Sequence, residues 1–335
     1  LAAGNTYKLS GEYIVEEGAT LHIEEGVKII AVYDDIADYI LVKQGGKINA
    51  VGTPDKPIVM TSEKEEPGAW GGIHICGRAH TNAEGGKGSS EIGGAVYGGN
   101  DDADNSGTLQ YIRLEYTGFA FDEEHEANGI SFYSVGNGTI VDHCQAYKGS
   151  DDGFEFFGGS VNVSNLVAVS CSDDSFDWTE GWNGKGTNLV AYQEAESTLG
   201  YDCDCLMECD NNGSNNAATP VAHPVLKNLI LVGNGGSKQG IRLRAGTEVE
   251  IDNAKVCGKG QPLTVETALT ENALKNGTSK LTNITLTSEL SSKEGIYTHA
   301  DFIAVTSNKV DANLSYSSFE DIRKECSWMN GSWVK

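Results

Sequence analysis

Short apolar runs separated by polar clusters recur along the whole chain. β-Branched and aromatic residues fill the runs, and Gly, Asn and Asp dominate the clusters between them. The 3.6-residue periodicity of an amphipathic helix is almost absent. This pattern is typical of strands joined by turns, so the sequence predicts a nearly all-β fold.

An internal repeat indicates how the strands are organised. The segment Ser150–Phe156 reads SDDGFEF and recurs 22 residues later as SDDSFDW at Ser172–Trp178. An apolar–polar–apolar triplet extends the repeat in both directions, with central residues Ser131, Glu155, Asp177, Glu208, Arg242 and Thr264. The intervals of 22 and 24 residues fit one coil each, and the intervals of 31 and 34 fit one coil plus a loop insertion.

A second series of apolar runs follows the triplets in the same order. Its members are 108–114, 139–144, 161–167, 187–192, 225–231 and 249–256. Two strands per coil, always in one order, predict a single-stranded parallel β-helix, a solenoid of about 22-residue coils stacked ~4.8 Å apart. Such a stack needs capped ends.

We expect one domain over residues 1–335, with clear coils over 1–265. Residues 266–335 repeat more weakly and are expected to form late coils and a C-terminal cap. There, Ser317 or Ser318 precedes Phe319–Lys324, a pattern that predicts a short capped helix acting as a lid on the stack.

Charge excludes several classes of partner. The chain has 48 acidic and 24 basic side chains, a net charge of −24. This argues against nucleic acid and against anionic lipid, both of which need Lys and Arg. No apolar run approaches the ~20 residues of a membrane helix, so we expect no membrane insertion. Since the sequence starts at Leu1, a signal peptide or lipid-bearing Cys is expected upstream, if there is one.

Several segments resemble a known class of protein. The matching stretches are 11–27, 45–53, 57–62, 70–77 and 97–109, together with the two Ser-Asp-Asp coils. They resemble secreted or cell-surface bacterial proteins of the pectin-lyase-like right-handed parallel β-helix type, over about residues 8–265. The resemblance implies a right-handed helix and a location at the bacterial outer surface or in the periplasm. It does not fix a function, because this fold hosts lyases, hydrolases, adhesins and phage tailspikes.

The triplets place acidic residues in one row. Successive strand residues face opposite ways, so the centres of the triplets should face outward on adjacent coils. This predicts a row of candidate catalytic residues, Glu155, Asp177, Glu208 and Arg242. The preceding corner holds candidate substrate-binding residues, Asp151, Asp152, Asp173 and Asp174. Carboxylates ~5 Å apart must bind a cation, share a proton with a raised pKa, or be well hydrated.

The first interpretation of this row is that it holds Ca²⁺ and binds a polysaccharide. Carboxylate oxygens suit Ca²⁺, with Glu155 and Asp177 as candidate ligands. The row resembles pectate-lyase-type sites, in which Asp residues on successive coils hold Ca²⁺ and an Arg assists proton abstraction beside a uronate carboxyl. Arg242 and Arg244 are expected to face outward near the row, with Arg244 as a further candidate substrate-binding residue. The alternative is that Arg242 only neutralises Glu208.

Polygalacturonase-type hydrolysis is a second comparison. Asp151-Asp152 and Arg242 are similar to parts of that pattern, in which two carboxyl groups act as acid and base. The Gly-His-Gly motif of such enzymes is missing, and no His lies between His143 and His223. Turn formation by Asp is the other explanation of the Asp-Asp corners.

A further calcium motif precedes the six triplets. In 100–107, Asp102 and Asp104 occupy the first and third places of a calcium loop, but the twelfth place is Arg113 rather than Glu. An EF-hand is therefore excluded, which leaves a structural Ca²⁺ site or an Asx-rich loop. We also expect Trp182 to stack on a sugar ring or to pack in the core.

Eight cysteines form no zinc-finger spacing. The cluster Cys203, Cys205 and Cys209 is interpreted as disulfides or buried thiols rather than as a soft-metal site.

Three functions follow from these patterns. The first is a secreted or surface protein that binds a polysaccharide through an acidic, calcium-loaded face. The second is a uronate lyase or glycoside hydrolase that uses the same face. The third is a non-catalytic adhesin or structural spacer.

Overall fold

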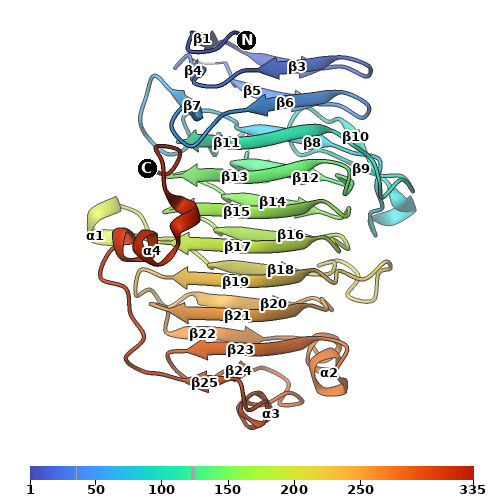
Figure 1. Ribbon diagram of the computed structural model, residues 1–335. Coiled ribbons are helices and arrows are strands. Elements are labelled where there is room, and N and C mark those ends of the chain that lie inside the picture. The colour runs from blue at the N-terminus through green and yellow to red at the C-terminus, as the bar shows by residue number, and fades with distance from the viewer. Residues whose placement is uncertain (35, 122–124) are drawn as a thin grey trace.

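The computed structural model describes residues 1–34, 36–121 and 125–335. The chain forms a right-handed parallel β-helix in which strands of successive coils lie side by side from one end of the molecule to the other (Figure 1). The predicted all-β solenoid is confirmed.

One long face is a ten-stranded parallel sheet. Its strands, in spatial order, are β2 (Glu12–Val15), β5 (Tyr39–Val42), β8 (Ile73–Cys76), β12 (Ile130–Tyr133), β14 (Phe154–Phe157), β16 (Phe176–Thr179), β18 (Met207–Asp210), β20 (Gln239–Arg244), β22 (Gln261–Val265) and β24 (Ser291–Ser292). The six predicted triplets are β12, β14, β16, β18, β20 and β22, paired in the expected register.

A thirteen-stranded parallel sheet surrounds the rest of the core. Its strands are β1 (Thr6–Leu9), β3 (Thr20–Ile23), β4 (Lys28–Ala31), β6 (Lys47–Val51), β7 (Ile58–Ser62), β11 (Gly107–Glu115), β13 (Ile140–Tyr147), β15 (Asn162–Val169), β17 (Lys185–Tyr192), β19 (Val225–Val232), β21 (Glu250–Cys257), β23 (Lys280–Leu286) and β25 (Lys309–Val310). β11 pairs with β6 through its first half and with β7 through its second half.

A single left-handed residue bends each long strand from β11 to β23. These residues are Tyr111, His143, Asn165, Asn188, Asn228, Asn253 and Asn283, with φ between 50° and 62°. The ladder pairing skips them, so each long strand contributes to two faces and the coil has three sides. Asn tolerates this conformation better than most residues, which explains its recurrence at the bend.

The bend asparagines bond to one another along the stack. Asn188 Nδ2 donates to Asn165 Oδ1 over 2.8 Å, Asn228 to Asn188 over 3.0 Å, and Asn253 to Asn228 over 2.8 Å. We call these four residues the asparagine ladder. The ladder gives the exposed corner amides partners on adjacent coils.

Aromatic rings stack inside the coils at matching positions. Phe132 and Phe156 lie 5.0 Å apart, and Phe154 and Phe176 lie 5.6 Å apart. Trp182 stacks on Phe156 with centroids 4.2 Å apart and is 1% exposed. Its indole N–H donates to the carbonyl of Val161. The prediction of Trp182 as a sugar-binding residue is therefore wrong, because the turn directs its ring into the core.

The C-terminal region differs from the expected lid. Helix α4 (Phe319–Glu325) forms where predicted, but with η2 (Ser327–Met329) it packs on the flank of the stack, over β15, β17 and β19 (Figure 1). Two other helices, α2 (Ala268–Asn276) and α3 (His299–Ala304), lie near the end of the stack, where Phe302 of α3 joins the main core. The C-terminal segment 311–335 is hereafter the strap.

Loop insertions explain the longer repeat intervals. Residues 193–206, with α1 (Glu196–Leu199), are inserted between β17 and β18, and residues 211–224 between β18 and β19. A third loop, residues 77–106, carries η1 (Glu84–Gly86) and the antiparallel pair β9 (Gly88–Ser89) and β10 (Val96–Tyr97). No helix among the described residues is long and apolar enough to cross a membrane.

Candidate functional site

The outward row forms as predicted on the ten-stranded sheet. Glu155 pairs with Asp177, Asp177 with Glu208, and Glu208 with Arg242 on successive coils. The loop insertions leave the register intact because they lie outside the strands. The row continues N-terminally to Ser131 and His74, which are both fully buried.

The row forms the floor of a pocket of about 480 Å³. The described residues contribute ten carboxyl groups to its lining: Glu91, Glu126, Asp151, Asp152, Glu155, Asp173, Asp174, Asp177, Asp204 and Glu208. Among the described lining residues, Arg242 is the single basic side chain. All four predicted corner residues are therefore brought together with the row.

Hydrogen bonds to the backbone of the next coil hold two of the four corner aspartates. Asp152 Oδ1 accepts the N–H of Asp174 over 2.8 Å, and Asp174 Oδ1 accepts the N–H of Cys205 over 2.6 Å. Asn128 occupies the same place one coil earlier and accepts the N–H of Asp152. Each Asp thus uses one oxygen to hold the next coil. Both residues are only 5% exposed.

The arginines neutralise one end of the row. Arg242 Nη1 lies 2.8 Å from Glu208 Oε2, and its Nη2 lies 3.3 Å from Glu266 Oε2. Arg244 pairs with Glu208 and with Asp210. Hydrogen bonds and ion pairs with these carboxylates raise the pKa of both guanidinium groups in spite of their burial. A guanidinium held in this way stays protonated and is a poor base for a lyase reaction.

The other end of the row lacks such neutralisation. Glu155 Oε2 accepts a hydrogen bond from Asn128 Nδ2 over 2.6 Å. Asp177 Oδ1 is buried and has no hydrogen-bond partner among the described residues. Burial, followed by repulsion from neighbouring carboxylates, raises the pKa of both residues well above the ordinary range. The same causes raise the pKa of Asp151 to about 7 and that of Asp173 to about 6.

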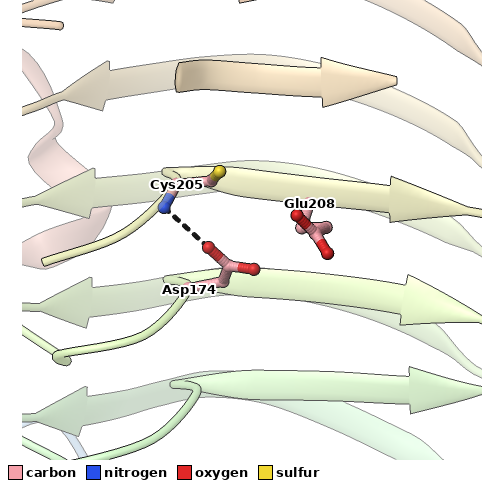
Figure 2. Close-up of side chains that lie close together, drawn as sticks. All are labelled: Asp174, Cys205 and Glu208. Carbon is pink, nitrogen blue, oxygen red and sulfur yellow. Dashed lines mark hydrogen bonds between the residues drawn. The ribbon is translucent and has the colours of Figure 1, made fainter. Parts of the chain in front are cut away.

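Three groups of side chains have potential ligand atoms within 4.8 Å of one another. Two contain only carboxylates: Asp151, Asp152 and Asp173, and Asp152, Glu155 and Asp177. The third consists of Asp174, Cys205 and Glu208 (Figure 2). The carboxylate groups offer the hard oxygen donors that Ca²⁺ prefers.

The separate calcium-loop candidates lie outside these groups. Asp102 Oδ1 lies 2.6 Å from His80 Nδ1, and Asp104 Oδ2 accepts the N–H of Arg78 over 3.1 Å. Both carboxylates therefore have partners within the loop, and neither belongs to a group of three potential ligands among the described residues. A calcium site at Asp102 and Asp104 remains a prediction from sequence.

Several pocket residues were not predicted. Glu91 and Glu126 come from the loops after β8 and β11, and Asp204 comes from the insertion before β18. The repeat could not predict them, because loop residues do not follow the spacing of the coils. Asp210, which pairs with Arg244 and is not among the described lining residues, could have been placed on the same face, since it lies two residues after Glu208.

The cysteines are buried and unpaired. All eight are free thiols, so the disulfide alternative does not apply and the buried-thiol alternative does. Cys209 lies in the core, whereas Cys205 lies beside the acidic pocket.

Comparison with known proteins gives one family. The sequence profile described as a pectate-lyase-like beta helix domain matches residues 1–334. No curated protein matches the chain at a significant level.

Proposed function

Because the chain belongs to the pectate-lyase-like beta helix domain family, we propose that it binds an acidic polysaccharide through Ca²⁺ held in the acidic pocket. The supporting observation is the buried Oδ1 of Asp177, which has no hydrogen-bond partner among the described residues, in a pocket to which those residues contribute ten carboxyl groups. A buried carboxylate with neither a hydrogen bond nor a cation is costly, and a divalent cation removes that cost.

The donor set fits calcium. Asp152 has one oxygen outside its corner hydrogen bond, and Glu155 and Asp177 add carboxylates whose oxygens lie within 4.8 Å of it and of each other. Ca²⁺ takes six to eight oxygen ligands in flexible geometry, and solvent or substrate oxygens complete such a shell. A uronate carboxylate is one such ligand.

Charge explains why the cation is needed for this substrate. The chain has a net charge of −24, and the pocket itself is acidic. A polyanion would be repelled by the metal-free surface and attracted once Ca²⁺ covers it. The pocket volume of about 480 Å³ lies within the usual range for ligand sites.

Electrophoresis of the protein through gels that contain polysaccharide tests this function. Wild type should be retarded by polygalacturonate in millimolar Ca²⁺ and should migrate freely in EDTA. Glu155→Gln with Asp177→Asn should abolish the retardation. The matched control is Asp55→Asn with Glu65→Gln, which removes two exposed charges outside the pocket. Equal retention of wild type with and without Ca²⁺, or of the pocket variant in Ca²⁺, would overturn the proposal.

Glycoside hydrolysis is a second candidate function. It is favoured by Glu155 and Asp177, two register-paired carboxyl groups with oxygens within 4.8 Å of each other, because most glycosidases use a pair of carboxyl groups. A carboxyl group with a raised pKa can serve as the general acid. New reducing ends formed in EDTA from a panel of acidic and neutral glycans would favour hydrolysis. No release from any glycan in the panel would count against it.

An extracellular or cell-surface location belongs to the same proposal, because the proposed substrate and free millimolar Ca²⁺ are found together outside cells. Detection of the full-length protein only in the cytoplasm would contradict it.

A further inference from the structure

We propose that the groove between the asparagine ladder and the strap binds a sugar ring of an uncharged polysaccharide. The groove has a volume of about 180 Å³. Its lining includes Asn188, Asn228 and Asn253 of the ladder and Glu325, Ser327 and Trp328 of the strap. It shares no described lining residue with the acidic pocket. The inference goes beyond calcium-dependent binding of an acidic polysaccharide and does not depend on it.

The ladder has amide groups that its own hydrogen bonds do not use up. An Asn amide carries two N–H donors and an oxygen with two lone pairs. Asn228 donates one N–H to Asn188 and accepts one from Asn253, so a donor and a lone pair remain without a partner among the described residues. Asn253 Oδ1 likewise accepts no hydrogen bond from them. Both side chains are exposed, so these groups can bond to sugar hydroxyls.

The amides are held in place before any ligand arrives. The three ladder residues of the groove have φ between 59° and 62° and lie on successive coils, which stack ~4.8 Å apart. Each amide is fixed by its neighbour on the adjacent coil. A sugar that bonds to such amides does not have to order them, which lowers the entropic cost of binding.

Trp328 supplies an aromatic wall. Its ring belongs to η2 and is half-buried, with centroids 6.2 Å from Trp333 and 6.4 Å from His143. The buried residues Leu229 and Ile230 add apolar lining. A rigid aromatic surface can stack against the apolar C–H face of a pyranose. An apolar wall with a few fixed polar groups is the usual composition of a small-molecule site.

Charge and size favour one uncharged ring. Lys255 and Glu325 are the charged residues of the described lining, and they form an ion pair with each other. Glu325 also accepts a hydrogen bond from Tyr316 over 2.9 Å. The groove therefore offers no unpaired charge from these residues to a uronate, and the net charge of −24 repels polyanions. A volume of about 180 Å³ lies below the ~300 Å³ at which sites for drug-sized ligands begin.

Electrophoresis through gels that contain hydroxyethylcellulose, galactomannan or xyloglucan tests this site. EDTA is present throughout, so that no calcium-dependent binding contributes. Wild type should be retarded by at least one of these polysaccharides. Trp328→Ala should abolish the retardation, and Trp328→Phe, which keeps a ring, should recover part of it. The matched control is Tyr33→Ala, which removes an exposed aromatic side chain outside the groove and should be retarded like wild type.

A second variant covers the case in which Trp328→Ala loosens the strap. Asn253→Asp keeps the side-chain size at an exposed position but replaces the amide donors by a charge, so it should also weaken the retardation. Urea denaturation checks that each variant is folded. Free migration of wild type in every neutral gel, or equal retardation of wild type and a folded Trp328→Ala or Asn253→Asp variant, would overturn the proposal.

Two crossed measurements separate this site from the calcium site. Glu155→Gln with Asp177→Asn should be retarded by the neutral gel like wild type. Trp328→Ala should keep the calcium-dependent retardation by polygalacturonate. Loss of both kinds of retardation in one folded variant would contradict two independent sites.

Discussion

Asp177 and Glu208 are register partners on adjacent coils, yet of the two only Glu208 forms ion pairs with basic side chains among the described residues. Glu208 is bridged by Arg242 and Arg244, whereas Asp177 has a buried oxygen with no partner among the described residues. The acidic row is thus neutralised at one end and unneutralised at the other. This asymmetry locates the proposed calcium site at the Asp177 end.

Asp177→Asn should stabilise the metal-free protein. The amide removes a carboxyl that is buried and repelled by Glu208 and Asp210. We expect the free energy of unfolding in EDTA to rise by about 1–2 kcal/mol, measured by urea denaturation at pH 8. Glu65→Gln, at an exposed position, should leave it unchanged. A loss of stability in Asp177→Asn would show that the carboxylate is already satisfied without metal.

The stability of the metal-free protein should fall as the pH rises. Asp151 ordinarily has a pKa of 3.8 and has a pKa of about 7 in the folded chain, so the folded state retains a proton that the unfolded state has released. The free energy of unfolding therefore decreases between about pH 4 and pH 7 and then levels off. For Asp173 the corresponding window ends at about pH 6. Thermal unfolding in EDTA should give a higher Tm at pH 5 than at pH 8.

His74 opposes this trend and needs a control. Its burial lowers its pKa from 6.5 to about 4, so the free energy of unfolding increases as the pH rises from about 4 to 6.5. Wild type and Glu155→Gln with Asp177→Asn share this contribution. The double variant should therefore lose less stability than wild type from pH 5 to pH 8. An equal or steeper loss in the variant would mean that the pocket carboxyls do not cause the pH dependence.

The asparagine ladder should stabilise the corner through both hydrogen bonds and backbone preference. Asn188 donates to Asn165, accepts from Asn228 and has a φ of 59°. Asn188→Ala should cost about 1–2 kcal/mol in urea denaturation because it loses both bonds and tolerates the left-handed conformation poorly. Asn188→Gly should cost less because glycine adopts that conformation readily. If the two variants lose equal stability, backbone conformation contributes nothing at this corner.

The strap should hold the flank of the stack. Trp333 is fully buried, 5.2 Å from the ring of His143 and 6.1 Å from that of Tyr111. Trp333→Ala should destabilise the protein by about 3–5 kcal/mol, measured by urea denaturation, because it removes a large buried ring. Trp333→Phe should recover much of the loss. A destabilisation below ~1 kcal/mol would show that the strap is only loosely docked.

Burial made the coils and the row predictable. Residues such as Phe154 and Phe156 must face the core, so Glu155 between them must face outward whatever the loops do. Stacking then aligned Glu155 with Asp177 and Glu208. The corner pair Asp173-Asp174 followed from the same repeat.

The pocket walls and the strap were not predictable in the same way. Glu91 and Glu126 reach the pocket from loops whose paths depend on tertiary packing. Trp182 follows a left-handed Gly181, and the sequence does not show which way that turn directs the ring. For the strap a signal existed: β15 ends in Leu-Val-Ala-Val, apolar on both faces, so its outer side needed a cover. We assigned the helix correctly and its docking surface incorrectly.

Thermal unfolding in EDTA and in millimolar Ca²⁺ shows whether the folded chain binds Ca²⁺ at Asp177. A ligand at ~100 times its dissociation constant adds ~2.7 kcal/mol to the stability of the folded state. We predict that Ca²⁺ raises the Tm of wild type by several degrees, that Asp177→Asn loses most of this shift, and that Asp55→Asn with Glu65→Gln retains it. An unchanged Tm in wild type, or an equal shift in Asp177→Asn, would contradict a calcium site at Asp177.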